Sequence, residues 1–220
     1  YNNRLINEDD FMKQMKRLET CNTDWFDILC RNSFSHNHNL SISGGSQKVT
    51  YNASFGYSSS HGTQKGDDMT QFTSRLNVNT QFTKSLSITF NLSGSFSDKK
   101  GYGPGVNPQS YANQTSRAIP VYDENGKRVF YKRYYEYQLN RSGQLEYGYN
   151  ILNEMENSYS KNNSKNFNVS INADWSITDW LKYQFVGSIA YSTNNSESFA
   201  GEKTSYIERN YRGYAYGTEP

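Results

Sequence analysis

A chain of 220 residues with 34% hydrophobic residues and a mean hydropathy of −0.92 is too polar to build an ordinary packed core of its size. Its 23 basic and 21 acidic residues are scattered, which excludes the basic stripe of a nucleic-acid-binding protein and indicates no charged partner. Because Tyr and Phe are abundant while Pro, Met and Cys are scarce, the composition favours an all-β fold.

The sequence shows neither a tripartite signal peptide nor an apolar run of the roughly 18 residues that a membrane-spanning helix requires. It also begins at Tyr1 rather than at an initiator Met. From these features we expect an internal fragment of a longer secreted precursor.

Residues 1–38 are predicted to form a loop that contains one short amphipathic helix. Asn7 precedes three acidic residues, as an N-cap does, and apolar side chains then recur at helical spacing at Phe11, Met15 and Leu18. Such a stripe is typical of a packing face rather than of a ligand site.

The same segment carries Cys21 and Cys30, which can either close a small loop through a disulfide or remain free thiols. Further on, His36 and His38 alternate on one face of an expected strand. A protein metal site needs three or four ligands, and a third is not evident nearby, so no metal site is predicted.

Between residues 39 and 193 the sequence alternates between apolar and small polar residues in six segments, as strands with two different faces do. In each segment the apolar residues fall on one face, and Asn, Ser and Thr dominate the other. The apolar rows lie within residues 40–42, 49–57, 72–82, 86–96, 167–175 and 181–191.

Alternation alone also suits a soluble β-sandwich, but two further features favour a transmembrane barrel. Several segments offer the roughly 9 to 11 alternating residues that cross a bilayer at a tilt, with aromatic residues near the ends of their apolar rows. Short turns at 44–48, 83–85 and 176–180 alternate with long loops at 58–71 and 97–165, and residues 194–220 begin a further loop. Because so few strands cannot close, we expect part of a large transmembrane antiparallel β-barrel with long extracellular loops.

The longest loop is predicted to contain a hairpin and a contact surface. Asn125-Gly126 lies between two apolar runs, which is a strong short-range hairpin signal. Tyrosines follow among basic residues and can stack on sugar rings or anchor a protein lid, at Tyr131, Tyr134, Tyr135 and Tyr137. The alternative is that these rings pack within the loop itself.

Catalytic chemistry finds no support in the sequence. No Gly-x-Ser-x-Gly elbow is present, and Asp67-Asp68 lies in a Gly-rich loop where solvation is the simpler interpretation. Gly101-x-Gly103-x-Gly105 contains Pro104 and is not expected to open a helix, so it does not form a phosphate loop. We therefore predict no enzyme activity and no cofactor.

A resemblance to the SusC/RagA family of TonB-linked outer-membrane proteins is carried by two stretches at the predicted start of the barrel. These are Thr23-Asp24-Trp25-Phe26-Asp27 and Ser35-His36-Asn37-His38-Asn39-Leu40-Ser41-Ile42-Ser43-Gly44-Gly45-Ser46. Weaker similarities follow in family order at Phe72-x-x-Arg75-Leu76-Asn77, at residues 120–126 and at Thr178-Asp179-Trp180-Leu181.

The resemblance implies an outer-membrane importer of glycans or oligopeptides, built as a plugged barrel of roughly 22 strands. It also implies a SusD-like surface lipoprotein as a lid, outer-membrane lipid around the barrel, and TonB acting through a plug that this chain lacks. The alternative function is a soluble β-sheet domain for carbohydrate binding or surface adhesion. The identity of the substrate is left open, because residues outside this chain contribute to specificity.

Overall fold

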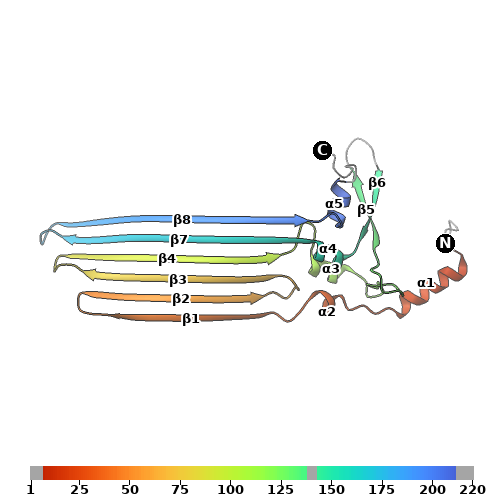
Figure 1. The fold of residues 1–220 in the computed structure, drawn as a ribbon, viewed down its shortest axis with the longest axis horizontal. Coiled ribbons are helices and arrows are strands. Elements are labelled where there is room, and N and C mark those ends of the chain that lie inside the picture. The colour runs from red at the N-terminus through yellow and green to blue at the C-terminus, as the bar shows by residue number, and fades with distance from the viewer. Residues whose placement is uncertain (1–6, 138–142, 212–220) are drawn as a thin grey trace.

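The computed structural model describes residues 7–137 and 143–211, which form one large antiparallel sheet and a smaller capping region at one end of its strands (Figure 1). Six strands make the large sheet, in the order β1-β2-β3-β4-β7-β8. Their bounds are Phe34–Gly45 (β1), Val49–His61 (β2), Asp68–Gln81 (β3), Leu86–Gly101 (β4), Ser158–Ser176 (β7) and Lys182–Ala200 (β8).

The connections between the strands separate into two groups, as predicted from their lengths. The short turns after β1, β3 and β7 lie at one end of the sheet, and the connections after β2, β4 and β8 lie at the other (Figure 1). The capping region consists largely of the segment between β4 and β7. This is the arrangement of a membrane barrel with short turns on one side and long loops on the other.

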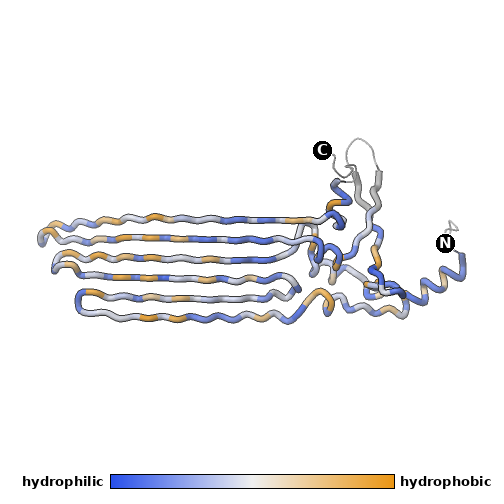
Figure 2. Tube along the Cα trace, viewed as in Figure 1, coloured by the Kyte–Doolittle hydropathy of each residue, from blue (hydrophilic) through white to orange (hydrophobic). Residues whose placement is uncertain are grey.

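One face of the sheet, here called the apolar face, joins the six predicted apolar rows. The register pairs Leu76 with Leu92 and Leu92 with Val169. Val169 in turn lies opposite Ile189, so one apolar row continues across four strands. Figure 2 shows apolar residues toward the turn end of the strands and hydrophilic residues toward the capped end. The alternation therefore predicted both the strands and their common face correctly.

The apolar face is exposed rather than packed. Leu40, Phe55 and Ile189 retain 64%, 65% and 72% of their accessible surface. In a β-sandwich a second sheet would cover them, but within the described residues the other sheet is the two-stranded β5-β6 pair of the capping region. An apolar face of this extent requires an apolar environment, which a bilayer supplies and the soluble alternative does not.

The opposite face, here called the polar face, is laced by side-chain hydrogen bonds. The Asn91 amide donates to the Ser170 hydroxyl across β4 and β7 at 3.2 Å. The Asn166 amide donates to Ser95 Oγ at 3.2 Å and its oxygen accepts from Ser192 Oγ at 2.6 Å. Short polar side chains of this kind suit the water-filled or plugged interior of a barrel.

The strands extend further toward the capped end than the alternation predicted. β1 begins at Phe34 rather than at Asn39, and the loop predicted at 58–71 is confined to residues 62–67. The loop predicted at 97–165 occupies residues 102–157, and β8 continues through Ala200, beyond the predicted loop start at 194. In these stretches polar residues dominate both faces, with Phe34, Met69 and Phe199 as exceptions, so the pattern of hydrophobicity is weak although the backbone ladder continues.

The capping region contains the remaining elements: α1 (Glu8–Thr20), α2 (Trp25–Leu29), α3 (Pro108–Gln114), α4 (Ile151–Asn157), α5 (Ser205–Tyr211), β5 (Tyr131–Tyr137) and β6 (Gly143–Tyr149). The predicted helix is confirmed as α1, with the Asn7 side chain accepting from the Asp10 amide at 2.7 Å. The other helices are 5 to 7 residues long, too short to show an apolar period. Among the described residues, none of the helices has the length and apolar character needed to span a membrane.

Candidate functional site

A small hydrophobic core holds the capping region together. Its buried side chains come from distant parts of the chain: Trp25, Leu29, Tyr111, Ala112, Val121, Tyr149 and Ile151. The rings of Trp25 and Tyr111 meet edge to face at 5.0 Å, and the guanidinium of Arg133 lies 4.0 Å from the centre of the Tyr149 ring. These contacts fix α2, α3 and β6 relative to one another at the end of the sheet.

The connection between β2 and β3, residues 62–67, is tied to the segment after α2. Arg31 donates from Nε to the Gly62 carbonyl at 3.1 Å and forms a 2.5 Å ion pair with Asp68. The Lys65 ammonium donates to the Asp27 and Ile28 carbonyls at 2.6 and 2.9 Å. The sequence indicated that Asp68 is a solvated loop residue. In the structure it is instead an ion-pair partner at the start of β3.

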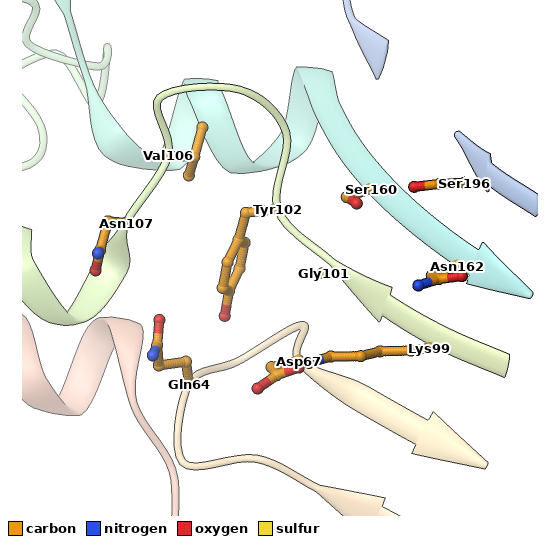
Figure 3. A pocket seen from close by; sticks show the side chains of 10 residues that line it. All are labelled: Gln64, Asp67, Lys99, Gly101, Tyr102, Val106, Asn107, Ser160, Asn162 and Ser196. Carbon is orange, nitrogen blue, oxygen red and sulfur yellow. The ribbon is translucent and has the colours of Figure 1, made fainter. Parts of the chain in front are cut away.

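A polar cavity of about 450 Å³ lies between this connection, the end of β4 and the tops of β7 and β8 (Figure 3). The strand residues that line it, Lys99, Ser160, Asn162 and Ser196, all belong to the polar face by the register. The other lining residues are Gln64, Asp67, Gly101, Tyr102, Val106 and Asn107. The cavity thus opens on the side of the sheet that would face a barrel interior.

Tyr102 is the aromatic side chain of the cavity. Its ring lies between Gly101 and Gln64, and its hydroxyl donates to the Lys65 carbonyl at 2.8 Å (Figure 3). Burial is the main cause that raises the pKa of Tyr102, to about 12. The hydroxyl therefore keeps its proton and its structural hydrogen bond throughout the physiological pH range.

The chemistry of the lining is that of recognition. Amides of Gln64, Asn107 and Asn162 and the serine hydroxyls offer both donors and acceptors, while Lys99 and Asp67 supply one charge of each sign. Groups of this kind suit hydroxyl-rich or amide-rich solutes beside an aromatic ring. Among the residues that the structure describes, no group of three or more His, Cys, Asp and Glu could hold a metal ion.

The tyrosines predicted as contact residues lie on β5, a strand of the capping region, rather than in an irregular loop. Tyr131 points inward: its hydroxyl donates to the Pro120 carbonyl at 2.7 Å, and burial raises its pKa to about 12. This favours internal packing for Tyr131. The side chains of Tyr134, Tyr135 and Tyr137 lie outside the described part of the structure, so their role stays a prediction.

Other sequence features have simple structural outcomes. The predicted hairpin is present: Gly126 adopts φ 74°, and the Asp123 amide donates to the Lys127 carbonyl at 2.8 Å. Cys21 and Cys30 are both free thiols. His36 and His38 lie side by side on the apolar face of β1, with ring centres 5.1 Å apart.

The cavity residues were not singled out from the sequence. Ser160, Asn162 and Ser196 continue the polar rows of β7 and β8 beyond the apolar band, and extending those rows would have found them. Tyr102 gave no comparable signal, because its place depends on where β4 ends and on contacts with the β2–β3 connection.

Gly103 lies where the capping region packs closely against β7, and this position leaves no space for a larger residue. A Cβ at this position would lie 2.4 Å from Ser158 Cβ and 2.8 Å from the Phe199 carbonyl oxygen, whereas one at Gly101 would meet nothing within 4 Å. Gly103→Ala should therefore cost about 1 to 3 kcal/mol through overpacking, and Gly101→Ala should cost little. Amide hydrogen exchange over residues 102–107 should rise about 5- to 150-fold in the first variant alone. Equal exchange in the two variants would contradict this packing.

The fold and the cavity together define the class of the protein: the sheet is part of a transmembrane β-barrel with a polar cavity at the capped end of its inner face. No protein-family model matches the chain. In structure it is similar to the RagAB peptide transporter, with a TM-score of 0.61 and 20% identity, over 81% of this chain and 20% of that chain. The same values hold for the RagAB peptide importer in its closed-closed state.

Two curated proteins are similar in sequence. The chain is 34% identical over 83 residues to the TonB-dependent receptor SusC of Bacteroides thetaiotaomicron, which covers 38% of this chain and 8% of SusC. It is 28% identical over 109 residues to the TonB-dependent receptor P26 of Formosa agariphila, covering 48% of this chain and 10% of P26. The match thus spans a tenth or less of either relative. By sequence and by fold the chain is similar to a segment of SusC/RagA-like TonB-dependent outer-membrane transporters, the resemblance that its sequence indicated.

Proposed function

We propose that this chain forms part of the barrel wall and outer mouth of an importer that takes oligosaccharides across the outer membrane. The observation that carries the proposal is the pairing of an exposed apolar face with a polar face that holds a cavity at its capped end. The transporter similarity of SusC, P26 and RagAB supports it. Substrate would enter from the capped side and pass along the polar face.

The capped end is proposed to be extracellular. Membrane barrels carry their long loops outside and their short turns on the periplasmic side, and here the long connections gather at one end (Figure 1). In this orientation a SusD-like lipoprotein would cover the capped end as a lid. TonB would supply the energy through a plug formed by other parts of the protein. No catalytic step or cofactor enters this proposal.

An oligosaccharide is the substrate class proposed first. The cavity offers three side-chain amides, two serine hydroxyls and the ring of Tyr102, which match the hydroxyl groups and apolar faces of sugars. An oligopeptide is the second candidate, because amides also pair with peptide groups and the structural relative RagAB is a peptide transporter. Lys99 and Asp67 could bind the termini of a short peptide.

Filling the cavity tests the proposal in the full-length protein. Ser196 lines the cavity. Its neighbour Asn195 belongs to the apolar face of the same strand and lies nearer the capped end than the apolar residues of that face. Ser196→Trp should reduce uptake or binding of the cognate substrate about tenfold or more, the effect of about 1.4 kcal/mol of lost binding. Asn195→Trp, the matched control, should leave uptake within about twofold.

Fluorescent oligosaccharide and oligopeptide pools, applied to cells that express each variant, identify the substrate class in the same experiment. Loss of oligosaccharide uptake in Ser196→Trp alone supports the first candidate, and loss of peptide uptake alone supports the second. Equal uptake of both pools by all variants, at equal amounts of folded barrel, would remove the cavity from the transport path.

A further inference from the structure

Above the apolar band, the apolar face carries a row of aromatic side chains that marks its upper limit. The register places His38, Tyr57, Phe72 and Phe96 directly opposite one another on four neighbouring strands. Ring centres lie 5.0 Å apart for Tyr57 and Phe72 and 6.4 Å apart for Phe72 and Phe96. From Leu86 to Phe96 the band rises about 25 Å at a strand tilt of about 40°, the height of the apolar belt in membrane barrels. The aromatic row therefore lies at the level of lipid headgroups.

Lysines continue this face immediately above the aromatic row. Lys165 lies opposite Phe96 in the register, with its ammonium 6.0 Å from the ring centre. Four residue pairs higher in the register, Lys100 on β4 lies directly opposite Lys161 on β7. Like charges in this position destabilise a sheet unless an anion lies between them. Among the described residues, neither ammonium forms an ion pair with a carboxylate.

A second cavity, of about 260 Å³, lies at this lysine pair. Lys100, Lys161, Asp68 and Tyr159 line it from the apolar face. The other lining residues come from the capped end and from the neighbouring polar-face rows: Lys65, Gly66, Gly101, Tyr102, Met155, Ser158 and Ser160. Asp68 lies directly opposite Lys100 in the register, but its carboxylate forms an ion pair with Arg31 at 2.5 Å and contacts His61 at 2.6 Å instead of pairing with a lysine. Lys65 donates two of its three N–H groups to backbone carbonyls and keeps its charge. The cavity therefore combines three ammonium groups with one carboxylate that has its own partners.

Two carboxylates stand near the lysines on the same face. Glu197 lies opposite Lys161 and accepts from the Tyr159 hydroxyl at 2.5 Å, and Asp98 lies opposite Asn163. These two carboxylates lower the net positive charge around Lys100 and Lys161, but neither forms an ion pair with one of these lysines among the described residues. The ring of Tyr159 lies 4.4 Å from the Lys161 ammonium, which holds this ammonium beside the cavity.

We infer that this cavity binds the phosphate monoester of an outer-leaflet lipid between Lys100 and Lys161, the lining residues that lie on the apolar face. A phosphate oxygen accepts from more than one ammonium at once, and this removes the repulsion between the two lysines. The site lies about 10 Å above the aromatic row by strand geometry, and lysine side chains reach several ångströms down toward the headgroups. The acyl chains would lie against the apolar band below. The inference rests on the proposed orientation and is independent of the substrate.

The test uses the full-length protein purified in detergent and titrated with phosphatidic acid, phosphatidylcholine or inorganic phosphate, with bound lipid measured by native mass spectrometry. The variant is Lys100→Gln with Lys161→Gln. The matched control, Arg75→Gln with Lys182→Gln, removes the same charge from the polar face of the sheet. Heat-modifiable electrophoretic mobility verifies that each barrel is folded.

Binding of phosphatidic acid should weaken about 30-fold in the variant, since each lysine near a charged headgroup contributes about 1 kcal/mol, and should be unchanged in the control. Phosphatidylcholine, which has no phosphate monoester, should bind weakly to both. Equal affinity of the variant and the unmodified protein for phosphatidic acid would overturn the inference. So would lysine-dependent binding of inorganic phosphate without preferential binding of phosphatidic acid, which would identify a site for free anions.

Discussion

Arginine on the apolar face should cost about 2 to 4 kcal/mol per substitution when the full-length barrel folds into a bilayer. The penalty arises because a guanidinium near the bilayer midplane loses its hydration without gaining a partner. Test positions on the apolar band are available on three neighbouring strands: Val78 and Ile171 near its middle, and Ile88 closer to its turn end, where the penalty should be smaller. Their sequence neighbours on the polar face provide matched controls, at Asn77, Thr89 and Asn172.

Folding yield into lipid vesicles, followed by the electrophoretic mobility of the folded barrel across a denaturant series, measures both sets. Substitutions on the apolar face should shift the equilibrium by about 30- to 1,000-fold, and those on the polar face by much less. If the two sets give the same shift, the sheet does not face lipid on this side. If the polar set is the more damaging, the faces have been assigned in reverse.

The faces could be predicted from sequence because the side-chain period of a strand is two and one face must meet lipid. Val78, Phe90 and Ile171 fall in one row in the structure, and each had been placed on the apolar side of its own segment. The short turns and the alternation together set the register, because a slip of one residue would turn an entire apolar row toward the polar side.

The capped end could not be predicted in the same way. Beyond the aromatic row most side chains of both faces are polar, so Lys100 and Lys161 gave no pattern by which their strands could be recognised. The capping core joins Trp25, Tyr111 and Ile151, which are far apart in sequence and belong to helices of 5 to 7 residues. Contacts of this kind depend on the tertiary arrangement, and a single sequence carries no periodic signal for them.

The residues that precede α2 and α3 nevertheless mark the starts of these helices, as the structure makes clear. Asp24 and Asn107 cap these helices by accepting hydrogen bonds from backbone amides at residues 26, 27 and 110. The hydrogen bond from the Asp27 backbone amide, together with the nearby guanidinium of Arg117 and the Phe26 amide, holds the pKa of Asp24 below its usual value. Capping residues therefore indicate where these two helices begin, although the helices are too short for the spacing of their apolar residues to indicate them.

Replacing Tyr134, Tyr135 and Tyr137 together by Ala should weaken association with the proposed SusD-like lid, or substrate uptake, by about 30-fold or more. Truncation of true interface anchors typically costs about 2 kcal/mol or more. These residues belong to β5, which pairs with β6 outside the six-stranded sheet. The barrel should therefore still insert. Copurification of the lid and growth on the cognate substrate are the two measurements.

Tyr131→Phe is the companion variant, because Tyr131 lies on the same strand but uses its hydroxyl within the capping region. Loss of that hydrogen bond should cost about 1 kcal/mol in stability of the capping region and leave lid association unchanged. A triple variant that retains both lid association and growth would reduce the three tyrosines to internal packing, the role that Tyr131 already shows. A Tyr131→Phe variant that loses the lid would instead indicate that the whole capping region must be rigid for the lid to bind, since this substitution removes no ring.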